Sequence, residues 1–128
     1  MNIINTDKAP TAVGPYSQAI RSGDFLFCSG QIAINPETKK LVDRKIENQT
    51  IQIFKNIKAV LNAGGFTLTN IVKTTVFLVN MNDFQIVNDI YANEFGTHKP
   101  ARSTVEVSQL PLNALIEIEC IAIYEKCQ

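Results

Sequence analysis

Apolar positions recur along the chain with two different periods, and the period separates predicted helices from predicted strands. Between residues 45 and 63 they recur every three or four positions, which predicts an amphipathic helix with Asp43 as N-cap and Gly64-Gly65 as its end. A second helical pattern begins at Asn82, with Gln85 three residues later as in a capping box, and ends at Gly96. The expected apolar faces are Ile46, Ile53, Phe54, Ile57, Val60 and Leu61 in the first helix, and Phe84, Val87, Ile90, Tyr91 and Phe95 in the second.

Short runs rich in β-branched and aromatic residues predict strands around these helices. The predicted strands are 17–21, Phe25–Ser29, Ile71–Val79, Ala101 or Arg102 to Val107, and Leu115–Tyr124. Ser22-Gly23-Asp24 is expected to join the first two strands as a hairpin turn, and residues 110–113 to join the last two. The strand at Ile71–Val79 is largely apolar on both faces, which indicates that both of its faces are covered.

The order of strands and helices predicts an α+β fold in one domain spanning residues 1–128, with both helices on one face of a mixed sheet. That arrangement leaves the other face of the sheet uncovered. Val72, Thr74, Val76 and Leu78, or the residues that alternate with them, would then be exposed. Since an exposed apolar sheet face of this extent usually marks an interface between subunits, we expect a homo-oligomer.

Charge and composition exclude several classes of function. Twelve basic residues balance twelve acidic ones without a basic stripe, which argues against a nucleic-acid partner. No run approaches the ~20 apolar residues of a membrane span, and the N-terminus lacks a signal-peptide pattern, so a cytoplasmic protein is expected. The three cysteines, Cys28, Cys120 and Cys127, lack CxxC spacing, and Cys28 and Cys120 are expected to be buried thiols. His98 is the one histidine and is expected to be solvated in a loop, and the glycines form no nucleotide-binding motif, so no metal or cofactor is expected.

Arg102 and the glutamates that follow it remain as candidates for chemistry. Arg102 and Glu106 share one face of their predicted strand, because side chains alternate along a strand. Glu117 and Glu119 share one face of the next strand. If these two strands pair through the turn between them, Arg102 and Glu117 lie on the same side of the sheet and close together. The spacing alone does not choose Glu117 over Glu106 or Glu119.

Such a pair could bind a small carboxylic acid and act on it. A guanidinium fork matches a planar carboxylate, and a glutamate can position or activate water. Arg102 would then also keep Glu117 ionised at neutral pH, because a nearby cation favours the charged carboxylate. The simpler interpretation is a cross-strand ion pair at the surface, worth less than ~1 kcal/mol.

Several sequence blocks resemble the RidA/YjgF family of reactive-intermediate (enamine/imine) deaminases. The blocks are AVGPYSQAI at 12–20, CSGQIAINPET at 28–38, NIKAVLNAGG at 56–65, IVKTTVFLVNMNDFQIVNDIY at 71–91 and PARSTVEVSQLPLNALIEIECIA at 100–122. The resemblance implies a chorismate-mutase-like α+β fold and a homotrimer. The three sheets of the trimer would line a central β-barrel, with clefts between subunits. It also implies hydrolysis, without metal or cofactor, of 2-aminoacrylate and 2-aminocrotonate, or their imines, from pyridoxal-phosphate dehydratases to 2-oxo acids and ammonia.

The resemblance also assigns roles to residues. Arg102 would clamp the substrate carboxylate and Glu117 would position or activate the attacking water. The residues implied to line the cleft are Tyr16, Ser29, Gly30, Gln31 and Asn88. Many relatives carry cysteine where Thr104 stands, so behaviour attributed to that cysteine is not expected here. Two alternatives stay open: a regulatory trimer that binds 2-oxo acids without turnover, and a translation-inhibitor or endoribonuclease-like role.

Overall fold

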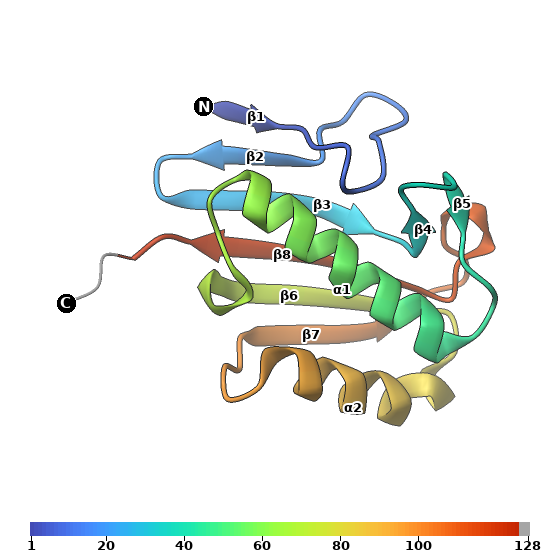
Figure 1. Cartoon of the computed structure of the whole chain (residues 1–128). Coiled ribbons are helices and arrows are strands. Elements are labelled where there is room, and N and C mark those ends of the chain that lie inside the picture. Colours follow the sequence, from blue (N-terminus) through green and yellow to red (C-terminus); the bar gives the residue numbers. More distant parts are fainter. Residues whose placement is uncertain (126–128) are drawn as a thin grey trace.

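The computed structural model describes residues 1–125 and arranges them as a twisted sheet with two helices packed across one face (Figure 1). Within those residues the six-stranded sheet has the order β1-β2-β3-β8-β6-β7, and β4 and β5 form a separate small hairpin. The elements are β1 (Asn2–Ile4), β2 (Ala19–Ser22), β3 (Phe25–Gln31), β4 (Ile34–Asn35), β5 (Lys40–Leu41), α1 (Ile46–Ala63), β6 (Ile71–Leu78), α2 (Phe84–Phe95), β7 (Ala101–Glu106) and β8 (Ile116–Ile123). Neither helix is long and apolar enough to cross a membrane.

Both predicted helices and the α+β class are confirmed, and the helix caps differ from the prediction. Lys45, not Asp43, is the N-cap of α1, and the Asp43 carboxylate accepts hydrogen bonds from Asn48 instead. Before α2, a 3₁₀ turn at Met81–Asp83 is capped by Asn80, whose Oδ1 accepts from the Asn82 amide at 3.0 Å. The asparagine two positions earlier therefore does the capping that we expected of Asn82.

The pairing of the last two predicted strands differs from the expectation. β7 and β8 are not neighbours, because β6 lies between them and pairs parallel with β7 and antiparallel with β8. Helix α2 connects β6 to β7, and a helical crossover returns the chain to the sheet in the same direction, which makes these strands parallel neighbours. β8 instead enters the middle of the sheet, and β7 becomes an edge strand (Figure 1).

The core lies between the helices and the sheet. Thr74, Val76 and Leu78 of β6 point into it and are buried, whereas the alternating Lys73, Thr75 and Phe77 lie on the open face and are half-buried. Cys120 is also buried, Cys28 beside it is half-buried, and Cys127 lies outside the described residues. Of the four residues first considered, Thr74, Val76 and Leu78 are therefore buried, whereas Val72 is 41% exposed at a shift in the register of the strand.

The open face of the sheet carries an apolar patch. The rings of Phe25 and Phe27 stack there with centroids 5.8 Å apart, and their side chains are 41% and 46% exposed. Ile121 and Ile123 of β8 are their register partners on the same face. Both helices lie across the opposite face of the sheet (Figure 1).

Candidate active site

Five of the predicted site residues line one cleft of about 650 Å³, next to the C-terminal end of β3 and the N-terminal end of β8. They are Tyr16, Ser29, Gly30, Gln31 and Glu117. We call this space the Glu117 cleft. Much of its wall is apolar and comes from the segment before β2, the β4 region and the turn at residues 111–112.

A β-bulge places the Glu117 carboxylate. Cys28 pairs with Cys120 and Gln31 with Ile118, so Ser29 and Gly30 together take the place of one residue in the ladder. The Glu117 side chain lies directly against Gly30: a Cβ at that position would come 2.8 Å from the Glu117 Cδ and closer still to its Oε2. Glycine at position 30 is therefore required for this position of the carboxylate.

The surroundings of Glu117 favour its protonated form. Burial raises the pKa of the Glu117 carboxyl above its ordinary value, and the negative charge of Glu119 raises it further. The expectation that Arg102 keeps Glu117 ionised is wrong within one chain, because no cation among residues 1–125 contributes to the pKa of Glu117. A carboxylate with a raised pKa is better suited to exchange a proton near neutral pH than an ordinary glutamate.

Gln18, which the sequence analysis did not single out, fixes one wall of the Glu117 cleft. Its buried side chain accepts from the Thr6 amide at 2.7 Å and donates to the carbonyls of Thr6 and Pro10 at 2.9 and 2.8 Å. The Ser29 hydroxyl likewise donates to the Ser17 carbonyl at 2.6 Å, so it braces the wall from β3. The sequence signal that could have identified Gln18 is a glutamine within an otherwise apolar strand pattern.

The other two predicted residues, Asn88 and Arg102, line a second cleft of about 450 Å³ between α2 and β7, which we call the Arg102 cleft. The Arg102 guanidinium lies over the ring of Tyr91, 4.7 Å from its centroid, and 5.6 Å from the ring centroid of Phe84. Among residues 1–125 it forms no hydrogen bond or ion pair with another side chain. Its donors are thus available to a ligand.

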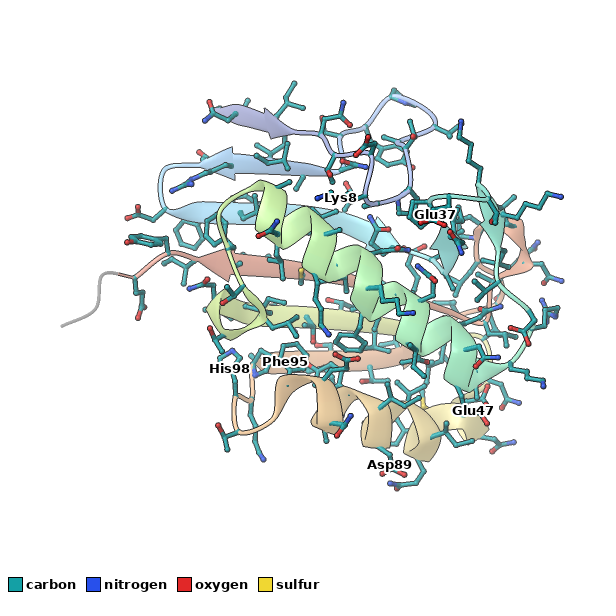
Figure 2. All side chains as sticks on the ribbon, in the orientation of Figure 1. Lys8, Glu37, Glu47, Asp89, Phe95 and His98 are labelled. Atoms are coloured by element: carbon teal, nitrogen blue, oxygen red, sulfur yellow. The ribbon has the colours of Figure 1, made fainter. Side chains whose placement is uncertain are left out.

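His98 closes one end of the Arg102 cleft. It lies beside Phe95 at the C-terminal end of α2 (Figure 2), with the ring centroids 6.0 Å apart. Its Nε2 donates to the Ile71 carbonyl at 2.6 Å, so the ring is partly buried rather than simply solvated as predicted. The histidine ties the loop before β7 to the start of β6.

Arg102 and Glu117 of one chain do not meet. Arg102 is the register partner of Thr74 on β6, whereas Glu117 is the partner of Phe77 on the other side of the same strand. Thr74 and Phe77 are three residues apart, about 10 Å along the strand, and an odd separation places their side chains on opposite faces. The prediction that Arg102 and Glu117 share a side is therefore wrong within one chain.

Of the three candidate glutamates, Glu117 is the one that lines a cleft. The Glu106 carboxylate accepts from the Met81 amide at 2.7 Å and so holds the turn before α2. Glu119 is exposed on the open face. Within residues 1–125, no group of three or more His, Cys, Asp and Glu side chains is placed to hold a metal ion.

Comparisons with known proteins agree with this architecture. The family model described as Endoribonuclease L-PSP matches residues 6–124. A RutC family protein of Pyrococcus horikoshii is 53% identical over 96% of this chain and 98% of its own. The 2-iminobutanoate/2-iminopropanoate deaminase of Dermatophagoides farinae is 44% identical, with 96% of both chains covered. The solved structure of the Rid family protein YyfA from Yersinia pestis superposes with a TM-score of 0.94 at 57% identity, covering 96% of this chain and 98% of that one.

Proposed function

The chain belongs to the RidA/YjgF family, and from this premise we propose that it hydrolyses 2-iminopropanoate and 2-iminobutanoate to the 2-oxo acids and ammonia. The observation that carries the proposal is the Arg102 guanidinium, which faces a cleft without an acidic partner among residues 1–125. A planar fork of this kind matches the carboxylate that these substrates share. A relative that is 44% identical over nearly its whole length bears the name of this activity.

Each catalytic site would be built from two copies of the chain. The carboxylate and the imine carbon of such a substrate are adjacent atoms, so the clamp and the water-activating group must lie within one small molecule's length of each other. Since Arg102 and Glu117 lie on opposite faces of one sheet, the Glu117 cleft of one copy must meet the Arg102 cleft of the next. A head-to-tail contact of this kind forms a ring when its rotation closes, and the trimer that the family resemblance implies would be such a ring, with the edge strand β7 of one copy beside the open sheet face of the next.

The residues of this composite site divide the reaction between them. Arg102 would bind the carboxylate, which orients the imine carbon toward Glu117. The enamine first tautomerises to the imine by protonation at carbon. Water then adds to the C=N carbon while Glu117 takes one of its protons and passes it to the nitrogen, which gives a carbinolamine. Glu117 next takes the proton of the new hydroxyl and delivers it to the nitrogen, so the C=O bond forms as the C–N bond breaks. The products are a ketone carbonyl and ammonia, so no electrons are transferred and no cofactor is required.

The balanced charge of the chain does not favour the alternative of an RNA substrate, because binding to a polyphosphate needs an excess of cations. A 2-oxo-acid-binding trimer without turnover would use the same Arg102 clamp. Glu117→Gln separates these two functions, since it should retain binding of 2-oxobutanoate and lose hydrolysis.

The experiment is a coupled assay in which a pyridoxal-phosphate threonine/serine dehydratase generates the enamine and 2-oxo acid release is followed. The wild-type protein should accelerate release, and Arg102→Ala and Glu117→Gln should each lose most of the acceleration. When the two variants are co-assembled, roughly a quarter of the sites should pair an intact Glu117 with an intact Arg102 from another copy, because subunits enter a closed ring at random. No acceleration by the wild type would overturn the activity, and no recovery in the mixture would overturn the shared site.

A further inference from the structure

The Arg102 guanidinium is oriented by aromatic rings rather than by an acidic side chain. The ring of Tyr91 lies 4.7 Å from the guanidinium carbon and that of Phe84 lies 5.6 Å from it. A carboxylate partner would occupy the donors of the guanidinium, whereas an aromatic ring attracts the cation to its face without accepting conventional hydrogen bonds from it. The two rings therefore hold the guanidinium in place and leave its N–H donors available to a ligand.

The Tyr91 ring is itself fixed from several sides. Its hydroxyl shares a hydrogen bond of 2.8 Å with the Thr74 hydroxyl, and both residues are buried, at 8% and 2% exposure. The ring also packs edge-on against Phe54, with centroids 5.9 Å apart, and tilted against Phe95 at 4.7 Å. Burial raises the pKa of the Tyr91 hydroxyl, so it stays neutral and leaves the charge of Arg102 uncompensated.

The register of the sheet connects these contacts. Thr74 is the direct partner of Arg102 across the parallel β6–β7 ladder, so both side chains leave the sheet on the helix side at the same level. Tyr91, from α2, reaches both of them: its hydroxyl binds Thr74 and its ring lies under Arg102. The three residues are therefore linked in sequence: Thr74 of β6 holds the Tyr91 ring, and the Tyr91 ring holds the Arg102 guanidinium.

We propose that Thr74 and Tyr91 are positioning residues that orient the Arg102 fork for the carboxylate of the substrate. The inference rests on the proposed function, because it assigns a role within the same site. It goes beyond that function because it names the residues that orient Arg102. The Arg102 side chain has several rotatable bonds and no ion pair among residues 1–125 to fix its direction. A guanidinium that its neighbours already hold in place loses less conformational freedom when it forms a two-point contact with a carboxylate.

The test compares affinity for a carboxylate with catalytic rate. Tyr91→Leu removes the ring and should weaken 2-oxobutanoate binding, measured by calorimetry, by about 10-fold, the change expected when a desolvated cation–ring contact is lost. KM for the imine should rise similarly while kcat changes little, because Glu117 and its water are untouched. The double variant Thr74→Val, Tyr91→Phe removes both hydroxyls but keeps the ring, so it should fold well and weaken binding by about 3-fold through a looser ring.

The chain contains a matched control in Arg21, whose guanidinium lies 5.1 Å from the ring centroid of Phe66, away from both clefts. Phe66→Leu removes an equally buried ring beneath an arginine, so it should lower stability without changing 2-oxobutanoate affinity or KM. Equal affinity in wild type and Tyr91→Leu, or equal losses in Tyr91→Leu and Phe66→Leu, would overturn the positioning role.

Failure of this inference can be distinguished from failure of the proposed function. If the wild type binds 2-oxobutanoate but does not accelerate 2-oxo acid release, the proposed deaminase activity is overturned. The comparison of affinities still decides the role of Tyr91. If the wild type neither binds nor hydrolyses, Arg102 is not a carboxylate clamp, and both proposals are overturned.

Discussion

At the scale of single residues, Glu117 is held where its charge is costly. Burial and the neighbouring Glu119 raise the pKa of Glu117, so the folded chain binds this proton more tightly than the unfolded chain does. The stability that comes from this proton is present below the unfolded pKa and is lost as pH rises through the folded pKa. At neutral pH the ionised carboxylate therefore opposes folding.

Glu117→Gln should accordingly raise the free energy of unfolding at pH 7 by about 0.5–1 kcal/mol, a typical gain when a strained functional group is removed. The gain should disappear below about pH 4, where the unfolded glutamate also binds its proton. The measurement is chemical unfolding across this pH range in an Arg102→Ala background, which removes any cation supplied by a neighbouring copy. Glu37→Gln, at an exposed position (Figure 2), is the control and should be neutral. A gain in the free energy of unfolding that persists unchanged below pH 4 would contradict a raised pKa of Glu117 as its cause.

At the scale of elements, the bulge in β3 determines where the Glu117 carboxylate lies. Gly30→Ala places a methyl group where the carboxylate lies, which forces the side chain to move. A displacement of about 1 Å at a catalytic group can cost on the order of 10–100-fold in rate, so the variant should lose activity to that extent and keep its fold. The measurements are the coupled assay and circular dichroism.

A second substitution tests whether the clash acts through Glu117. Glu117→Asp shortens the side chain by one methylene, which withdraws the carboxylate from position 30 and leaves the Cγ position, 3.1 Å from a Cβ there, as the nearest contact. Adding Gly30→Ala to Glu117→Asp should therefore cost much less than it costs the wild-type chain. An equal loss of activity in both backgrounds would show that Gly30→Ala acts through the backbone of the bulge instead.

The elements also show what the sequence could and could not predict. The helical periods and the β-branched runs placed both helices and the main strands within a few residues, because burial of one face imposes those periods. Strand order was missed, since periodicity carries no information on which strands become neighbours. The crossover through α2 determined it, and the insertion of β6 between β7 and β8 separated Arg102 from Glu117.

For the candidate site, the sequence named residues but not how they are arranged in space. The motif resemblance named seven residues, and all of them line one of the two clefts. Gln18, Thr74 and Tyr91 were not assigned to the site, because a buried hydrogen bond or a ring beneath a guanidinium depends on contacts between distant segments. Tyr91 was predicted only as part of an apolar helix face.

At the scale of the whole molecule, the open face of the sheet is the surface on which we expect copies to associate. Phe27→Asp places a charge in the apolar patch formed with Phe25, Ile121 and Ile123, and burial of an unpaired charge opposes association. If the chain forms the trimer proposed above, the variant should give smaller species in light scattering and should lose hydrolysis. Ile51→Asp alters an equally exposed apolar residue on α1, on the helix side, and should leave both unchanged. A trimer that survives Phe27→Asp would place the interface elsewhere.

The separation of Arg102 and Glu117 by a single strand has a genetic consequence. If each site is shared between copies, a subunit that lacks both residues spoils two sites of a trimer, one with each neighbour, and leaves one intact. Equal expression of such an allele beside the normal one would then reduce activity to roughly a quarter rather than to half, because both contributors to a site must be normal. Lesions at this site would therefore be partly dominant, whereas lesions that only unfold the chain would be recessive.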